Sequence, residues 1–95
     1  MAIVRITRPP MVTAEIYDAV NAKAGVEENP PEGLLIHTAG DVDGQWQIVD
    51  VWESEEAADR FGDERLMPAV ESVMGGTPPG PQPATVYELH KVMMP

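Results

Sequence analysis

The sequence contains no cysteine and few basic residues, and both shortages narrow the functions open to it. Without cysteine, the 95-residue chain can form no disulfide, no thiolate metal site and no thiol nucleophile. Six lysines and arginines stand against sixteen aspartates and glutamates, which gives a net charge of −10. Such an acidic chain repels phosphate backbones and anionic lipids, so we expect no nucleic-acid or membrane partner. The missing disulfides fit a reducing compartment, and we expect a cytoplasmic protein.

Long apolar runs and several well-known catalytic motifs are also missing. No apolar run approaches the roughly 18 residues of a membrane span, and the first residues lack the apolar core of a signal peptide. There is no glycine-rich phosphate loop, no Gly-x-Ser-x-Gly elbow and no His-Glu-x-x-His motif. Nucleotide-dependent, serine-hydrolase and zinc-protease chemistry therefore have no support. A chain of this length holds one core, and we expect a single domain over residues 1–95.

The first third of the chain predicts a strand, a helix and a loop. Residues 2–8 are rich in β-branched side chains and precede two adjacent prolines, which predicts a strand that ends there. Thr13 predicts the N-cap of a helix that Gly25 closes, because apolar residues between them recur at spacings of three and four. Residues 26–33 contain another pair of prolines and no periodicity, so they predict a loop.

A β-hairpin is the clearest local signal in the sequence. Strand-like segments over 34–40 and 45–53 flank Asp43-Gly44, a dipeptide that tolerates the positive φ angles of a type I′ turn. Counting outward from that turn pairs His37 with Asp50, and Leu35 with Trp52.

The remaining segments predict a second helix and a last strand. Ser54, followed by acidic residues, predicts the start of the helix, and Gly75-Gly76 its end. Pro68 predicts a kink or a restart within the helix. Residues 77–83 carry four prolines and predict an extended connector, after which residues 84–93 predict the strand.

The order of these elements predicts a ferredoxin-like α+β fold. The succession βαββαβ in under 100 residues gives a four-stranded antiparallel sheet with both helices on one face. Right-handed crossovers then fix the strand order as 4-1-3-2.

Alternation along the strands divides the sheet positions into two sets. A mixed set combines tryptophan, histidine and charged residues with aliphatic ones: Ile3, Arg5, Thr7, Leu35, His37, Ala39, Trp46, Ile48, Asp50, Trp52, Val86, Glu88, His90 and Val92. A mainly aliphatic set holds Val4, Ile6, Leu34, Ile36, Thr38, Gly40, Gln47, Val49, Val51, Tyr87 and Leu89. We expect the aliphatic set beneath the helices and the mixed set on the open face. Its apolar patch would exceed what a monomer leaves exposed, so we expect a second copy to cover it, sheet against sheet, in a homodimer.

His37 and Asp50 are the best candidates for catalysis. A carboxylate bonded to one imidazole nitrogen orients the ring and raises its basicity, which leaves the other nitrogen free to act as a base. The pair would equally serve as structural support, in which each side chain satisfies the other across the hairpin. The sequence leaves both roles open.

Other polar and aromatic residues of the mixed set are candidates for substrate binding. Trp46 and Trp52 would wall a flat aromatic ligand, although as core or interface residues they need none. Arg5, Glu88 and His90 form a second polar cluster, for which an Arg5–Glu88 ion pair is the simpler interpretation.

The histidines and carboxylates of the mixed set are also of the types that bind metals. His37 lies on one outer strand, however, and Glu88 and His90 lie on the other, about 14 Å away within one subunit. We therefore expect no metal site.

One segment carries a family resemblance. Ile48 to Ala57, Ile-Val-Asp-Val-Trp-Glu-Ser-Glu-Glu-Ala, is similar to the strand-to-helix junction of the dimeric α/β-barrel proteins, particularly the antibiotic biosynthesis monooxygenase-like branch. The segment order agrees over nearly the whole chain. The resemblance implies a dimeric α/β barrel whose cavity binds a small, flat, largely apolar molecule. The haem-degrading branch has its proximal histidine on or after the second helix, whereas this chain has no histidine between His37 and His90.

The resemblance also implies a type of reaction, that of a cofactor-independent monooxygenase. In this hypothesis His37, oriented by Asp50, removes a proton from a phenolic or enolic substrate of polyketide type, and the carbanion reacts directly with dioxygen. No cofactor is expected. The alternatives are an isomerase, cyclase or decarboxylase that uses the same base without oxygen, and a non-catalytic ligand-binding or structural dimer.

Overall fold

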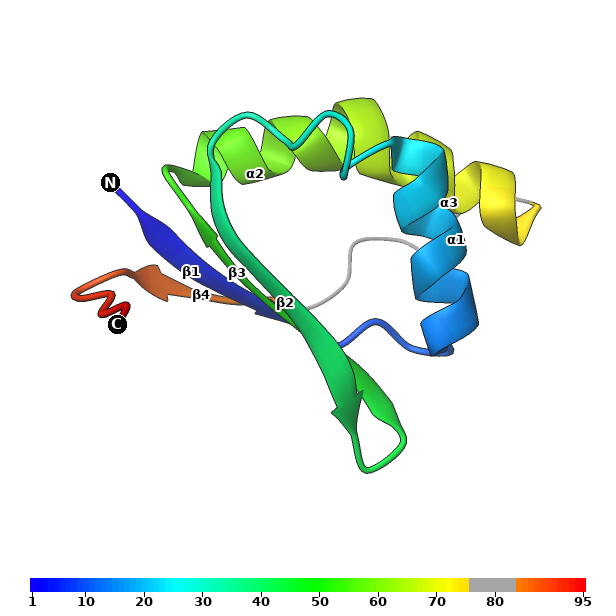
Figure 1. Ribbon diagram of the computed structural model, residues 1–95, viewed down its shortest axis with the longest axis horizontal. Helices are drawn as coiled ribbons and strands as arrows, with labels where there is room; N and C mark the ends of the chain where they lie inside the picture. Colours follow the sequence, from blue (N-terminus) through cyan, green and yellow to red (C-terminus); the bar gives the residue numbers. More distant parts are fainter. Residues whose placement is uncertain (76–83) are drawn as a thin grey trace.

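A computed structural model describes residues 1–75 and 84–95 and gives a sheet with helices on one side (Figure 1). Its elements are β1 (Ile3–Thr7), α1 (Ala14–Ala24), β2 (Leu34–Val42), β3 (Gln45–Trp52), α2 (Glu55–Phe61), the π-helical turn η1 (Gly62–Leu66), α3 (Met67–Met74) and β4 (Ala84–Glu88). The strands are antiparallel in the order β2-β3-β1-β4, which confirms the predicted fold and strand order, counted from the opposite edge. The predicted connector over 77–83 lies outside the described residues. No helix in the described ranges has the length and apolar character that a membrane span requires.

Side-chain caps and glycine set the helix ends where the sequence predicts them. The hydroxyl of Thr13 accepts a hydrogen bond from the backbone N–H of Ile16 at 3.2 Å, and α1 begins there. The hydroxyl of Ser54 accepts one from Ala57 N–H at 3.1 Å and starts α2 in the same way. Gly25 ends α1 with a φ of 67°, a left-handed conformation that glycine adopts without strain.

The hairpin turn is the predicted one, but the register changes once along β2. Asp43 and Gly44 have φ angles of 52° and 88°, so both have the positive values of a type I′ turn. The turn aligns His37 with Asp50, as predicted. A β-bulge then makes Leu35 the extra residue, and Leu34 lies opposite Trp52 instead. The predicted pairing of Leu35 with Trp52 is therefore wrong.

The helices cover the mixed face of the sheet, and the predicted assignment of the two faces is wrong. Trp52, only 3% exposed, and Ile3 form the core with Ala57 and Ala58 of α2. The alanines allow the helix to approach the sheet closely and leave room for the indole ring. We call this helix-facing side of the sheet the inner face. It carries Ile3, Arg5, Leu34, His37, Trp46, Ile48, Asp50, Trp52, Val86 and Glu88.

The opposite side, which we call the outer face, points away from the helices (Figure 1), although Val4 and Val51 on it are buried. It carries Val4, Ile6, Ile36, Thr38, Val49, Val51, Thr85 and Tyr87. The apolar patch left open therefore consists of aliphatic residues and a tyrosine rather than of the two tryptophans.

The second helical segment continues past Pro68 instead of breaking there. The backbone N–H of Met67 bonds to the carbonyl of Gly62, five residues earlier, so one wide π-helical turn joins α2 to α3. Pro68 consequently lies in the first turn of α3, where its missing N–H costs no hydrogen bond. The run of three elements bends over the sheet in Figure 1.

Strand β4 is shorter than predicted. It ends at Glu88, and the last backbone bond to the neighbouring strand runs from Leu89 N–H to the carbonyl of Ala2 at 2.9 Å. Because β1 begins at Ile3, this bond marks the end of the pairing between β4 and β1. His90 and Val92 accordingly lie beyond the sheet.

Gly33 provides a test of how closely α2 approaches the sheet. A Cβ at Gly33 would lie 2.6 Å from the Cβ of Ala57, whereas a Cβ at Gly44 meets nothing within 4 Å. Both glycines have a φ of 88°, so an alanine is strained at either position. We expect Gly33→Ala to lower the free energy of unfolding by about 1–3 kcal/mol more than Gly44→Ala, because only the former overpacks the core. Urea unfolding followed by tryptophan fluorescence measures the difference, and equal losses would contradict the close approach.

Candidate functional site

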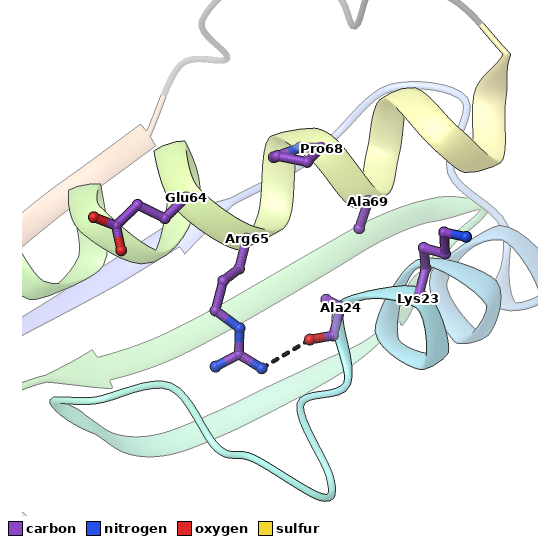
Figure 2. A pocket seen from close by; sticks show the side chains of 6 residues that line it. All are labelled: Lys23, Ala24, Glu64, Arg65, Pro68 and Ala69. Atoms are coloured by element: carbon purple, nitrogen blue, oxygen red, sulfur yellow. Dashed lines mark hydrogen bonds between the residues drawn. The ribbon is translucent and has the colours of Figure 1, made fainter.

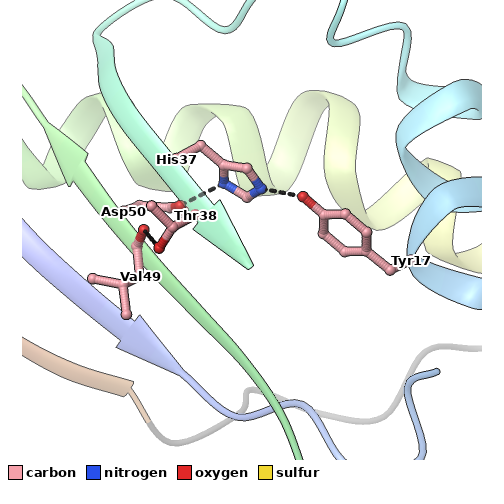
Figure 3. Close-up of polar contacts among 5 residues, drawn as sticks. All are labelled: Tyr17, His37, Thr38, Val49 and Asp50. Carbon is pink, nitrogen blue, oxygen red and sulfur yellow. Dashed lines mark hydrogen bonds and ion pairs between the residues drawn. The ribbon is translucent and has the colours of Figure 1, made fainter. Parts of the chain in front are cut away.

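Three side chains from three elements form one hydrogen-bonded chain on the inner face (Figure 3). The Nδ1 atom of His37 on β2 lies 2.5 Å from Oδ1 of Asp50 on β3. Its Nε2 atom is hydrogen-bonded to the hydroxyl of Tyr17, which reaches across from α1. The order is therefore Tyr17–His37–Asp50, with both nitrogens of the imidazole engaged.

The sheet register holds the sheet side of this network in place. His37 and Asp50 are directly opposite each other on β2 and β3, and Arg5 is opposite Asp50 on β1. A row of three polar residues thus crosses the inner face. The guanidinium of Arg5 lies 3.8 Å from the carboxylate of Asp59 on α2, so Arg5 joins the sheet to the helix above it.

The two rings of the network meet edge to edge. The planes of Tyr17 and His37 differ by only 2°, and their centroids are 5.9 Å apart. This arrangement points the phenol oxygen along the lone-pair direction of Nε2, as a hydrogen bond requires. The indole of Trp46 packs against the other side of the site, with its centroid 5.2 Å from that of Tyr17 and a tilt of 45°.

Tyr17 is the site residue that the sequence analysis missed. Its signal was nevertheless present, because Tyr17, Val20 and Ala24 follow one another at spacings of three and four along the helix. Val20 is buried and Tyr17 is half-buried, so both belong to the inward side of α1. Only the structure shows that Tyr17 meets His37, since nothing in the periodicity relates the helix to a particular strand residue.

Burial and charge shift the proton affinities of the network. The hydrogen bond that the Asp50 carboxylate accepts from His37 raises the pKa of His37 above its usual value of 6.5, although partial burial opposes the shift. Burial raises the pKa of the Tyr17 phenol above 10.0, and the negative charge of Asp50 adds to this rise. Tyr17 is therefore a neutral phenol near pH 7, while His37 can take up a proton and remain paired with a carboxylate.

The inner face also holds N–H donors that lack an acceptor. Within residues 1–75 and 84–95, the Nε atom of Arg5 and the Nε1 atoms of Trp46 and Trp52 are buried without a hydrogen-bond partner. Buried donors are normally paired in folded proteins. These three buried donors are therefore available to a ligand that carries acceptors.

The other predicted binding residues lie at different distances from the network. Trp46 packs against Tyr17 of the network, whereas Trp52 lies two residues beyond Asp50 on the same face of β3 and contacts Phe61 in the core. Glu88 is on the outer strand β4, and His90 is exposed beyond the end of that strand. The structure thus brings together His37, Asp50 and Trp46, with Arg5 beside them. In the part of the chain that is described, no three histidine or acidic side chains are placed to share a metal ion.

Two pockets in the described part of the chain lie away from this network. One, of about 280 Å³, lies between the end of α1 and the start of α3 and is shown in Figure 2. The guanidinium of Arg65 crosses it and donates to the carbonyl of Ala24 at 2.7 Å, which satisfies the end of α1. A second, of about 220 Å³, lies between the 29–32 loop and α2. Neither pocket is lined by a histidine, so we place the candidate site at the network, where the His37 side chain is 34% exposed.

Comparison with solved structures identifies the fold. A candidate antibiotic biosynthesis monooxygenase from Caulobacter crescentus superimposes with a TM-score of 0.62 at 17% identity, over 95% of this chain and 89% of that one. A mutant of SnoaB, a cofactor-independent oxygenase from Streptomyces nogalater, gives 0.57 at 14% identity, over 97% and 94%. The heme-degrading protein Rv3592 from Mycobacterium tuberculosis gives 0.60 at 19% identity, over 99% and 100%.

The chain has the fold of the antibiotic biosynthesis monooxygenase-like proteins. This agrees with the resemblance seen in the sequence. No protein-family model matches the sequence, and no curated protein matches it significantly. At these identities the likeness concerns the fold, and the activity has to be argued from the side chains of the site.

The pairing of His37 with Asp50 predicts a specific pH dependence. We expect Asp50→Asn to lower the pKa of His37, because it removes the hydrogen bond that raises it. A raised pKa in the folded state stabilises the protein below the unfolded value of about 6.5, and this contribution is lost as pH rises through the folded value. The stability advantage of the wild type over Asp50→Asn should therefore be largest near about pH 6 and shrink at higher pH.

NMR titration of the imidazole measures this shift directly. The chain has two histidines, so His90→Gln leaves His37 as the sole imidazole and serves as the common background for the titration. Urea unfolding of the same proteins across the pH range provides the stability comparison. An unchanged His37 pKa in Asp50→Asn would contradict the hydrogen bond.

Proposed function

We propose that the protein binds a small, flat, largely apolar molecule between α1 and the β2 edge, beside Tyr17, His37 and Trp46, and that His37 accepts a proton from it. The observation that carries this proposal is the continuous Tyr17–His37–Asp50 chain on the inner face. Asp50 holds the ring and stabilises the imidazolium that forms on proton uptake. The indole of Trp46 offers a flat surface for an aromatic ring, packed against Tyr17. The unpaired donors of Trp46 and Arg5 favour a ligand that carries oxygen acceptors.

The reaction we favour is cofactor-independent oxygenation of a phenolic or enolic substrate. Loss of a proton gives an electron-rich anion that reacts directly with dioxygen, so the protein has to supply a base, a position and protection from water. The network supplies the base. The fold shared with a cofactor-independent oxygenase supports this choice over the other reactions that use a base.

Two other functions use the same residues differently. An isomerase, cyclase or decarboxylase would use the base and consume no oxygen. A non-catalytic binding protein would use His37 and Asp50 only as structural support, in which case removing them would lower stability without removing a reaction. The histidine and aspartate variants separate these possibilities.

Oxygen uptake by the purified protein is the first test. With anthrones and dihydroxynaphthalenes as substrates, we expect uptake by the wild type and a loss of at least about a hundredfold in His37→Ala and Asp50→Ala, because a positioned base contributes about 10²–10⁴ in rate. His90→Ala is the matched control, since His90 is exposed outside the strands. Substrate loss without oxygen uptake would favour non-oxidative chemistry. Binding without turnover would leave the non-catalytic function.

We also propose that two copies pair through their outer faces. The strand positions of the outer face carry no charge, in a chain that has 22 acidic and basic residues among its 95. Tyr87 is 51% exposed on this face, although its neighbours Val4 and Val51 are only 6% and 8% exposed and Ile36 is partly buried. Exposed apolar surface of this kind is normally covered, and a two-fold axis through the sheet would bury it against itself. The predicted homodimer is thus retained, on the face opposite to the one predicted.

Sedimentation equilibrium tests the dimer. We expect twice the chain mass of 10.3 kDa for the wild type at micromolar concentration and for Ser72→Glu, a control that adds the same charge at an exposed position of α3. Val49→Glu places a charge in the middle of the outer face, and burying it unpaired is unfavourable enough to give the mass of a single chain. A wild type at the chain mass would contradict the proposed dimer.

A further inference from the structure

Both ring nitrogens of His37 are occupied in the folded chain. Nδ1 is held by Asp50 at 2.5 Å, and Nε2 is held by the hydroxyl of Tyr17. A ligand can therefore reach the imidazole directly only by displacing Tyr17. The phenol oxygen differs from the imidazole in this respect. A hydroxyl has one proton and two lone pairs, of which the bond to His37 uses one and the side chain of Asn21 uses a second, so one lone pair remains.

The position of Tyr17 leaves the remaining lone pair of its hydroxyl open to a ligand. Tyr17 comes from α1, on the far side of the site from the two strands (Figure 3), and its ring contacts both that of His37 and the indole of Trp46. A flat molecule that lies against Trp46 would thus meet the Tyr17 hydroxyl before it meets the imidazole.

We infer that Tyr17 is the catalytic residue that contacts the ligand, through a hydroxyl that exchanges a proton with the acidic O–H of a phenol or an enol, while His37 and Asp50 act behind it. This inference rests on the binding function proposed above. It changes His37 from a base that touches the ligand to a positioning residue that receives the proton from Tyr17.

The proton transfer balances without any further reactant. With neutral His37, Nδ1–H donates to Asp50 and Tyr17 O–H donates to Nε2. When the ligand gives its proton to the Tyr17 oxygen, the original Tyr17 proton moves to Nε2. The result is a ligand anion, a neutral Tyr17 and an imidazolium paired with the Asp50 carboxylate. The new Tyr17 O–H then donates to the ligand oxyanion, and Nε2–H donates to Tyr17.

The charges around the network favour this two-step relay over a tyrosinate base. Burial raises the pKa of Tyr17, and the carboxylates of Asp50, Asp18 and Glu27 add to the rise, which keeps the phenol protonated. Asn21 on α1 opposes the shift. Arg5 on β1 neighbours Asp50 in the register, but its guanidinium is directed to Asp59 on α2. The positive charge therefore forms on His37, next to Asp50.

Two related probes distinguish contact through Tyr17 from binding by shape alone. 4-Nitrophenol carries the acidic hydroxyl, and 4-nitroanisole has a methyl ether in its place. We expect the wild type to bind both and to raise the phenolate fraction of bound 4-nitrophenol, measured by absorbance at a pH where the free probe is mostly protonated. In Tyr17→Phe, 4-nitrophenol should bind about tenfold more weakly, as expected for a lost hydrogen bond to a charged group, and the phenolate gain should vanish. Binding of 4-nitroanisole should change less than about twofold.

The outcomes separate this inference from the proposed function. If Tyr17→Phe keeps the phenolate gain and His37→Gln loses it, the ligand lies on His37 directly and the inference is overturned while the binding function stands. If the wild type binds neither probe, the binding function fails and the inference falls with it.

A second measurement avoids any dependence on the folding of Tyr17→Phe. The chain has two tyrosines, so Tyr87→Phe leaves Tyr17 as the only tyrosine. Its ring NMR signals should shift with 4-nitrophenol more than with 4-nitroanisole, and equal shifts would overturn the inference.

Discussion

The packing of Trp52 against α2 fixes the arrangement of every other residue in the site. Ala57 and Ala58 bring the helix close enough to cover the indole and Ile3, and this contact determines which side of the sheet lies beneath the helices. Strand alternation then places Asp50 and Trp46 on the same face as Trp52, because each lies an even number of residues from it. A hydrophobic contact at one end of β3 thus places the Asp50 carboxylate, two residues away, beneath the helices.

That placement gives the polar residues an environment they would not have on the outer face. His37 and Asp50 are partly shielded, with side chains 34% and 16% exposed, so their hydrogen bond is weakened less by water than a surface pair would be. Tyr17 becomes part of the network only because α1 lies over this side. On the outer face, His37 and Asp50 would have no helix above them and no contact with the Tyr17 phenol.

Local and pairwise features were predictable from the sequence, whereas the choice of face was not. The Asp43-Gly44 turn, the caps at Thr13 and Ser54 and the pairing of His37 with Asp50 each depend on short-range geometry, and the structure contains them all. Alternation separates two sets of residues but does not say which set meets the helices. A mainly aliphatic set favours burial beneath helices, but the small alanines of α2, which favour bulky partners such as Trp52, indicate the opposite.

The contact between Tyr17 and His37 could not be predicted from the sequence for a related reason. It joins residues 20 positions apart on elements that share no backbone hydrogen bonds, so neither periodicity nor register relates them. Glu88 and His90 show the converse error. Their types suggested a polar cluster with Arg5, but the guanidinium of Arg5 is directed to Asp59 rather than to Glu88, and His90 lies beyond the end of β4.

The β-bulge at Leu35 has a consequence for how such a chain can change in evolution. The hairpin turn sets the alignment of His37, whereas Leu34 is aligned by its position opposite Trp52. These two alignments differ by one residue, and the bulge at Leu35 takes up that residue. Insertions or deletions in the 25–33 loop can therefore be accommodated at the bulge without rotating His37 off the inner face. The loop is free to diversify in length among descendants of this sequence while the imidazole and its carboxylate stay aligned.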